Sequence, residues 1–106
     1  MMYQIAYLPA ARQDLIEIAS YISHKLQNPR AAESLALHII NAMDHLSSFP
    51  YANPVYTPIR PLRHEYRRLI VKNYIVLYWI DEKSKTITIA SVVYYRRDYS
   101  DFIKQT

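Results

Sequence analysis

Few side chains in this sequence could do covalent or metal chemistry. The 106 residues include no cysteine and no glycine, which rules out thiol nucleophiles, disulfides, zinc fingers and glycine-rich phosphate loops. The four histidines are scattered, at His24, His38, His45 and His64. Only His38 and His45 are spaced to share a helix face. We therefore expect neither a metal site nor a cofactor.

The cationic side chains gather in the second half of the chain. Of the 13 Lys and Arg residues, ten lie from residue 60 onward, together with five of the nine Asp and Glu residues. All of the net charge of +4 therefore comes from this half. Such a distribution favours an acidic partner, either nucleic acid or an acidic polypeptide. A charged surface that only keeps the protein soluble is the alternative.

Two amphipathic helices are predicted to position these groups. Apolar residues follow helical spacing from Ala10 to Leu26, and a second apolar face continues to about Ser48. Between them, Asn28-Pro29 indicates an N-cap followed by proline at the first helical position. Because the connection is short, we expect an antiparallel helical hairpin. The apolar run before Pro9, from Tyr3 to Leu8, predicts an edge or second-row strand.

The second half predicts three consecutive strands. Residues 49–61 include four prolines and suit an extended loop that its tyrosines would order. Strands are predicted at about 63–71, 74–80 and 86–94. Asn73 is expected to take the left-handed conformation in the tight turn Lys72-Asn73. The order β-α-α-β-β-β predicts an α+β fold, with an N-terminal helical hairpin packed on a mainly antiparallel twisted sheet, in a single domain of residues 1–106.

The middle strand is apolar on both of its faces. Successive residues of a strand point to opposite sides, and the two sets are Tyr74, Val76, Tyr78 and Ile80, and Ile75, Leu77 and Trp79. The helices can cover one set. We expect the other face to seat a partner segment, with nearby arginines as its rim. Cover by the proline-rich loop or by residues 99–106 is the alternative.

The order and spacing of several short fragments resemble the RelE/ParE toxin superfamily over nearly the whole chain. The matching fragments are Ala11, Asp14-Leu15, Ile18, Tyr21-Ile22, Pro29, Ala31-Ala32, Leu46, Phe49-Pro50, Tyr66-Arg67-Arg68, Tyr74 to Tyr78, Ile87, Ile89 and Arg96-Arg97-Asp98. The resemblance implies a toxin of a type II toxin–antitoxin module, of the plasmid-stabilisation type, neutralised by a cognate antitoxin. The antitoxin would be acidic and amphipathic and would fold on binding. Operator DNA would be contacted only through the antitoxin.

One branch of the superfamily, the RelE-like branch, cleaves mRNA in the ribosome. Cleavage needs a base, an acid and cations around the phosphate. The resemblance places Arg67 and Arg97 on two cationic positions of this branch. Tyr99 or Tyr95 could stack on a base or transfer a proton, and His64 could act as the base. Packing against the sheet is the alternative role for the tyrosines, and a surface position is the alternative for His64.

Three positions depart from the RelE-like pattern. Ile75 stands where that branch has an arginine, Leu69 where it has a lysine, and Ile103 where it has a tyrosine. Apolar side chains cannot replace a charge at the phosphate or transfer a proton. The three substitutions therefore weaken the nuclease interpretation.

The ParE-like branch inhibits DNA gyrase by binding, without chemistry of its own, and the sequence resembles this branch better. We therefore predict gyrase inhibition, with Arg68, Tyr74, Trp79 and Arg96 binding the antitoxin or the target. The alternatives are a ribosome-dependent endoribonuclease, which would be an enzyme, and a nontoxic, decayed binding module. The sequence has neither a secretory signal nor a long apolar run, so we expect a cytoplasmic protein without membrane contact.

Overall fold

The computed structural model describes residues 2–56 and 64–94. Its elements are, in chain order, β1 (Gln4–Tyr7), α1 (Pro9–Ser20), the π-helical turn η1 (Tyr21–Lys25), α2 (Pro29–Ser48), β2 (Arg67–Val71), β3 (Tyr74–Asp81) and β4 (Thr86–Tyr94). This order confirms the predicted α+β fold. No helix of the described part is long and apolar enough to cross a membrane.

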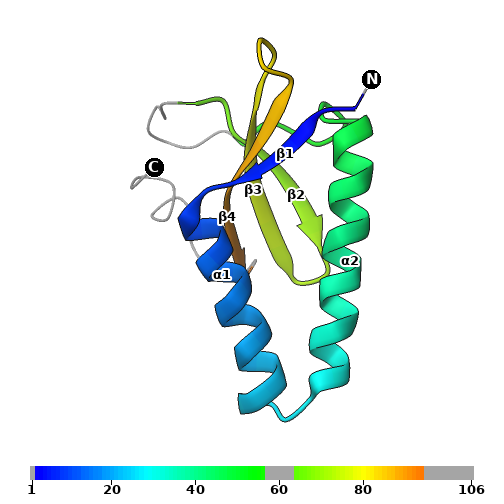
Figure 1. Cartoon of the computed structure of the whole chain (residues 1–106), viewed down its shortest axis with the longest axis vertical. Helices are drawn as coiled ribbons and strands as arrows, with labels where there is room; N and C mark the ends of the chain where they lie inside the picture. The colour runs from blue at the N-terminus through cyan, green and yellow to red at the C-terminus, as the bar shows by residue number, and fades with distance from the viewer. Residues whose placement is uncertain (1, 57–63, 95–106) are drawn as a thin grey trace.

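The four strands form one mixed sheet, in the order β1-β4-β3-β2 (Figure 1). β2 pairs with β3 and β3 with β4 in antiparallel fashion, whereas β1 joins β4 in parallel, with Ile5 opposite Ile87. The predictions of a mainly antiparallel sheet and of an edge strand near the N-terminus are therefore correct. The parallel pair brings together the first and last strands of the described chain.

Proline starts both helices. Pro9 and Pro29 occupy first-turn positions, where a missing backbone N–H costs nothing. The Asn28 side chain accepts a hydrogen bond from Ala31 N at 3.1 Å, as predicted for an N-cap. The prediction of regular α-helix up to Leu26 is wrong for the last turn. There Leu26 N donates to Tyr21 O at 3.1 Å, a bond five residues back that widens the turn before the chain reverses.

The main core lies between the helices and one face of the sheet (Figure 1). The stripe of α2 that faces the sheet consists of Leu35, Ile39, Met43 and Leu46. On the sheet the core includes Val76, Tyr78, Ile87, Ile89 and Val92. The helical spacing in the first half and the alternation in β3 therefore identify the two surfaces that meet.

The opposite face of the sheet carries a second, smaller core. It consists of Tyr66, Ile75, Leu77, Ala90 and Val93, with Leu8, Tyr56 and Trp79 packed against it. Leu77 is 0% and Ile75 5% exposed. The expectation that this face is open for a partner is therefore wrong for these residues, because the chain buries them itself. Tyr56 brings part of the proline-rich loop into this cover, whereas residues 99–106 lie outside the described part.

Asp14 ties α1 to an irregularity in β4. The register shifts so that Leu77 lies opposite Ser91 but Tyr78 lies opposite Ile89, which marks a β-bulge. The half-buried Asp14 carboxylate accepts hydrogen bonds from Val92 N at 3.0 Å and from Ser91 Oγ at 3.4 Å. Burial raises the pKa of Asp14 above its ordinary value, and these two hydrogen bonds partly oppose the shift.

Two local predictions in the second half need correction. Lys72 rather than Asn73 has the positive φ, of 56°, because this turn needs a left-handed residue only at its first central position. β2 begins at Arg67 rather than at residue 63. The loop nevertheless pairs with the edge of the sheet: Val55 bridges to Arg67, and Arg68 N donates to Pro54 O at 3.1 Å.

Candidate functional site

Three predicted site residues, His64, Arg67 and Trp79, converge beside the start of β2. They line a concavity of about 120 Å³, here called the Arg67 notch, formed by Tyr51, His64, Glu65, Arg67, Trp79 and Ile80. The strand register explains its position. Arg67, the first residue of β2, pairs with Tyr78, so Trp79 and Ile80 extend beyond the start of β2 and, among the described strands, pair only with β4.

Stacked aromatic rings form one wall of the notch. The His64 and Trp79 rings are nearly parallel, at 4°, with centroids 3.9 Å apart. Tyr66 meets Trp79 edge-on at 5.7 Å and 87°. Stacking gives His64 a packing role, and its action as a base stays a prediction.

Arg67 is held from three directions. Its Nη1 donates to Asn53 O at 2.7 Å, and its guanidinium carbon lies 5.0 Å from the centroid of the Tyr51 ring. Glu65 Oε1 is 3.8 Å from Nη2. The Arg67 side chain is only 16% exposed. These contacts fix an arginine in place at the rim of the concavity.

Tyr51 is itself fixed by a hydrogen bond to Glu82, which lies in the turn between β3 and β4. Its carboxylate accepts hydrogen bonds from the hydroxyls of Tyr3 and Tyr51 and from Lys85 Nζ. The hydrogen bond from Lys85, followed by those from Tyr51 and Tyr3, lowers the pKa of Glu82 to about 2. Donation to Glu82 raises the pKa of Tyr51 to about 12. This exposed cluster links β1, the proline-rich loop and the β3–β4 turn.

Tyr78 fixes the same loop from inside the protein. Its hydroxyl is buried, donates to Pro50 O at 2.8 Å and accepts from Asn53 Nδ2 at 3.2 Å. Burial raises the pKa of Tyr78 above its ordinary value. The prediction that the loop's own tyrosines order it is supported in its described part by Tyr51, which binds Glu82, whereas Tyr78 belongs to β3 and was not part of that prediction. The roles of Glu82 and Asn53 were missed, because nothing in a turn carboxylate or a loop amide indicates a partner remote in sequence.

The other predicted binding residues do not join the notch. Arg68 pairs with Leu77, next to the pair of Arg67 and Tyr78, so the two arginines face opposite sides of β2, as the strand alternation predicts. Tyr74 lies at the other end of β3, where its ring meets Tyr94 edge-on at 5.8 Å. Arg96, Arg97 and Tyr99 lie outside the described residues.

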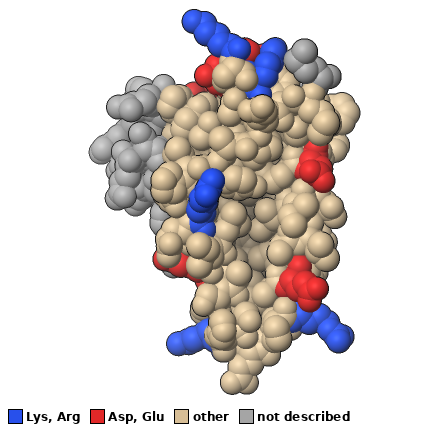
Figure 2. All heavy atoms as spheres, viewed as in Figure 1, with Lys and Arg blue, Asp and Glu red and all other residues tan. Residues whose placement is uncertain are grey.

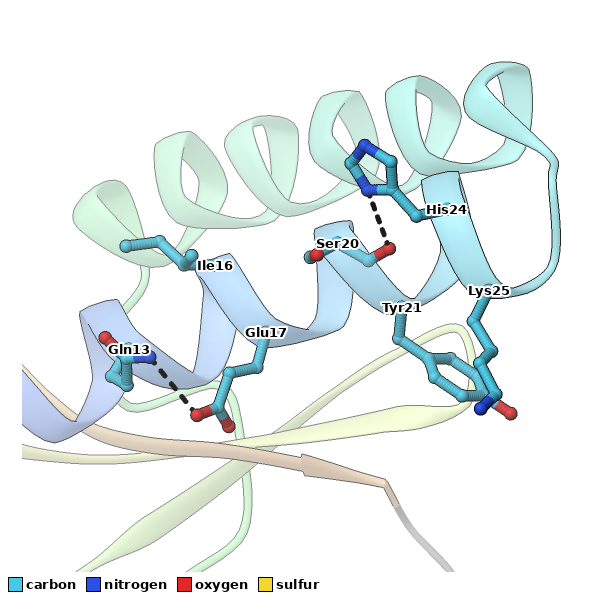
Figure 3. A pocket seen from close by; sticks show the side chains of 7 residues that line it. All are labelled: Gln13, Ile16, Glu17, Ser20, Tyr21, His24 and Lys25. Carbon is cyan, nitrogen blue, oxygen red and sulfur yellow. Dashed lines mark hydrogen bonds between the residues drawn. The ribbon is translucent and has the colours of Figure 1, made fainter.

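A shallow groove runs along the outer side of α1 and η1 (Figure 3). Ile16 projects from the side of α1 nearer α2, whereas Tyr21 and Lys25 point to the other side. The polar groups are satisfied locally: Glu17 accepts from Gln13 Nε2 at 3.2 Å, and His24 Nδ1 lies 3.2 Å from Ser20 O. The groove therefore suits contact with another molecule better than catalysis.

The face that carries α1 and α2 is largely uncharged: one basic side chain lies within it, and the other charged side chains lie toward its edges (Figure 2). Several large apolar side chains on the helices are exposed, among them Ile16 at 61%, Leu37 at 56% and Ile40 at 56%. Within residues 2–56 and 64–94, no three His, Asp or Glu side chains are grouped to hold a metal ion.

The fold is shared with solved structures of toxin–antitoxin systems. One similar solved structure is the ParDE toxin–antitoxin system of P. aeruginosa, with a TM-score of 0.68, 17% identity and coverage of 88% of this chain and 96% of that one. Another is the RelBE2 complex of Mycobacterium tuberculosis, with a TM-score of 0.60, 23% identity and coverage of 89% and 92%. A third is the RelE–RelB complex of Pyrococcus horikoshii OT3, with a TM-score of 0.61, 18% identity and coverage of 92% and 99%.

The sequence itself identifies the family. The family model described as the ParE toxin of the type II toxin–antitoxin system parDE matches residues 5–99. The chain therefore belongs to this family, within the RelE/ParE superfamily, and is a toxin of the type II toxin–antitoxin class. No curated protein sequence matches it significantly.

Proposed function

We propose that this toxin inhibits DNA gyrase by binding it and performs no chemistry of its own. The observation that carries this proposal is the apolar second core of the sheet. Ile75, which stands where the nuclease branch has an arginine, is 5% exposed and packed in that core. Leu69, which stands where that branch has a lysine, packs against the main core on the helix side. Apolar packing at these positions supports a binding protein rather than a phosphate-cleaving site.

A supercoiling assay tests the proposal directly. Purified toxin is added to gyrase, ATP and relaxed plasmid, and the expected result is a dose-dependent loss of supercoiled product. A reaction without toxin and one with heat-unfolded toxin serve as controls. Unchanged supercoiling at a molar excess of folded toxin would contradict gyrase inhibition.

A ribosome-dependent nuclease is the alternative, and the convergence of His64 and Arg67 on one notch favours it. In that case, induction should produce transcript ends at codon boundaries on translating ribosomes. Arg97→Ala should abolish these ends, because the resemblance places Arg97 at the phosphate. Intact transcripts after induction, combined with blocked supercoiling, would exclude this alternative.

We further propose that the cognate antitoxin covers the helical face of the toxin. Exposed Ile16, Leu37 and Ile40 present apolar surface that an amphipathic segment can bury. Two of the three similar complexes are RelE–RelB or RelBE pairs and one is a ParDE pair, so each contains an antitoxin. The candidate partner is the product of a short neighbouring reading frame with an acidic, amphipathic end.

Co-purification with that neighbouring product tests the interface. The double variant Leu37→Asp and Ile40→Asp should lose co-purification and leave growth inhibited, because buried aspartates would be unpaired. Asn41→Asp on the same helix is the matched control, since Asn41 is already polar and exposed. Full retention of the partner by the double variant would place the antitoxin elsewhere.

A further inference from the structure

We infer that the toxin, when its antitoxin is absent, forms a two-fold symmetric dimer through the outer face of its helical hairpin. The occupant of this face is a second copy of the same chain. The residues that meet are Arg12 and Ile16 of α1 and Leu37, Ile40 and Asp44 of α2. The inference rests on the surface proposed above for the antitoxin, and it adds a second copy as the occupant before the antitoxin binds.

Each helix of the hairpin carries an exposed apolar stripe that ends in a charge. Ile16 projects from the side of α1 nearer α2 (Figure 3), and Arg12, four residues earlier, lies on the same side of the helix. On α2, Leu37 and Ile40 are three residues apart and Asp44 follows Ile40 by four, so all three share one side. Ile16, Leu37 and Ile40 are each more than half exposed. The hairpin therefore leaves these apolar side chains uncovered.

The short loop of the hairpin sets the level of each side chain along the helices. Ile16 precedes the end of η1 by nine residues, or about 14 Å at about 1.5 Å per residue. Leu37 and Ile40 follow the start of α2 by eight and eleven residues, or about 12 and 17 Å. Arg12 and Asp44 lie farther from the loop, at about 20 and 23 Å. Ile16 is thus level with the gap between Leu37 and Ile40, and Arg12 is nearly level with Asp44.

A two-fold axis that runs along the hairpin, parallel to both helices, makes this face complementary to itself. Such an axis places α1 of one copy on α2 of the other. It keeps every residue at its level, since rotation about an axis changes no position along it. Ile16 then lies between Leu37 and Ile40 of the second copy, and Arg12 meets Asp44 of the second copy. Each contact occurs twice, as in any two-fold interface.

The charges favour a second copy over an unrelated partner. The helical face is largely uncharged (Figure 2), and within residues 2–56 and 64–94 neither Arg12 nor Asp44 forms a salt bridge. A partner that neutralises both charges must present an acid opposite Arg12, a base at nearly the same level opposite Asp44, and apolar side chains between these charges and the loop. The outer face of a second copy meets all of these requirements.

The size of the face predicts a weak dimer. The hairpin is about 30 Å long, the length of a 20-residue helix, and about 20 Å wide, the width of two helices. Two such faces bury at most about 1,200 Å² together, which is the low end for specific interfaces. We therefore expect a dimer in reversible equilibrium with the monomer at micromolar protein concentrations.

Sedimentation equilibrium of the purified full-length toxin, from about 1 to about 300 µM, tests self-association. The expected result is a reversible monomer–dimer equilibrium. Ile16→Asp should weaken the dimer about 100-fold, because two unpaired carboxylates would be buried at the interface. Ile70→Asp is the matched control, since Ile70 is 65% exposed on β2, and it should dimerise as the wild type does. Circular dichroism verifies that each variant is folded.

Exchange of charges tests the pairing of Arg12 with Asp44. Arg12→Glu and Asp44→Arg should each weaken the dimer at least about tenfold, because two attractive pairs become repulsive. An equimolar mixture of these two variants should dimerise as tightly as the wild type, since both pairs between the chains again join opposite charges. Lys83→Glu, in the exposed turn between β3 and β4, makes the same change of charge as Arg12→Glu and should leave dimerisation unaltered.

Three outcomes would overturn the inference. They are a monomer at every concentration, unchanged dimerisation of Ile16→Asp, and a mixture of the charge variants that associates no more tightly than either variant alone. The co-purification experiment tests the antitoxin surface separately. A monomeric toxin that loses its partner in the double variant Leu37→Asp and Ile40→Asp would refute self-association alone. A dimeric toxin whose double variant keeps its partner would refute the antitoxin surface alone.

Discussion

Replacing Asp14 should reveal how much the link between α1 and the β4 bulge stabilises the fold. Val92 is 3% exposed, and its N–H donates to Asp14 at 3.0 Å. Asp14→Ala leaves this buried donor without its acceptor, which costs about 1–3 kcal/mol. For a domain of this size, each kcal/mol lowers Tm by about 4–8 °C. Urea unfolding followed by Trp79 fluorescence, together with thermal unfolding, measures both quantities.

Asp14→Asn separates the hydrogen bond from the charge. The amide oxygen can still accept from Val92 N, and the cost of burying a carboxylate disappears. At neutral pH this variant should therefore be at least as stable as the wild type. Because the folded pKa of Asp14 is raised, its protonation stabilises the wild type below the ordinary value of 3.8. That contribution is lost as pH rises through the folded pKa. The free energy of unfolding of the wild type should therefore increase relative to that of Asp14→Asn only at acidic pH.

Glu17→Ala is the control for this series, because Glu17 is an exposed carboxylate on the same helix. Its effect should stay within about 0.5 kcal/mol. Equal stability of Asp14→Ala and Asp14→Asn would refute the reasoning, since only the alanine variant lacks an acceptor for the bulge. A wild type that loses stability relative to Asp14→Asn as pH falls would refute the sign of the pKa shift.

Three further predictions follow from other contacts. Leu77→Ala should lower the free energy of unfolding, measured by urea denaturation, by about 2–5 kcal/mol because Leu77 is fully buried in the second core. The control Ile70→Ala, at an exposed position, should change it by less than about 0.5 kcal/mol. Equal losses in the two variants would disprove that core. Tyr78→Phe should cost about 1–3 kcal/mol in the same assay, since two loop groups lose their buried partner; a neutral result would mean that the loop does not depend on this hydroxyl. In Glu82→Gln, an NMR titration should show the pKa of Tyr51 falling from about 12 toward 10.0, and a value that stayed near 12 would exclude Glu82 as its cause.

Patterns that repeat along the chain predicted the fold well. Helical spacing in the first half and alternation in β3 each depend on neighbours within a few residues, so they can be read locally. Asn28-Pro29 was a correct N-cap for the same reason. The π-helical turn and the bulge opposite Leu77 each come from one extra residue, and no residue type marks such an insertion.

The candidate site was less accessible to sequence reasoning. His64, Arg67 and Trp79 were identified individually by type, but their meeting depends on where β2 begins relative to β3. Glu82 joins Tyr3 and Tyr51 across 79 and 31 positions of the chain. The apolar second face was correctly recognised in β3, yet apolar alternation cannot tell whether the chain itself or a partner covers it. Burial of Leu77 within the chain answers that question.

The parallel pairing of β1 with β4 sets an order of events during synthesis. Gln4 must find Thr86, and the intervening chain includes both helices and both other strands. The helical hairpin can form early from local contacts, but the sheet lacks one of its two central strands until β4 has been made. The toxin is thus unfinished for most of its own translation. An antitoxin already present in the cell would meet the helices before the complete sheet exists.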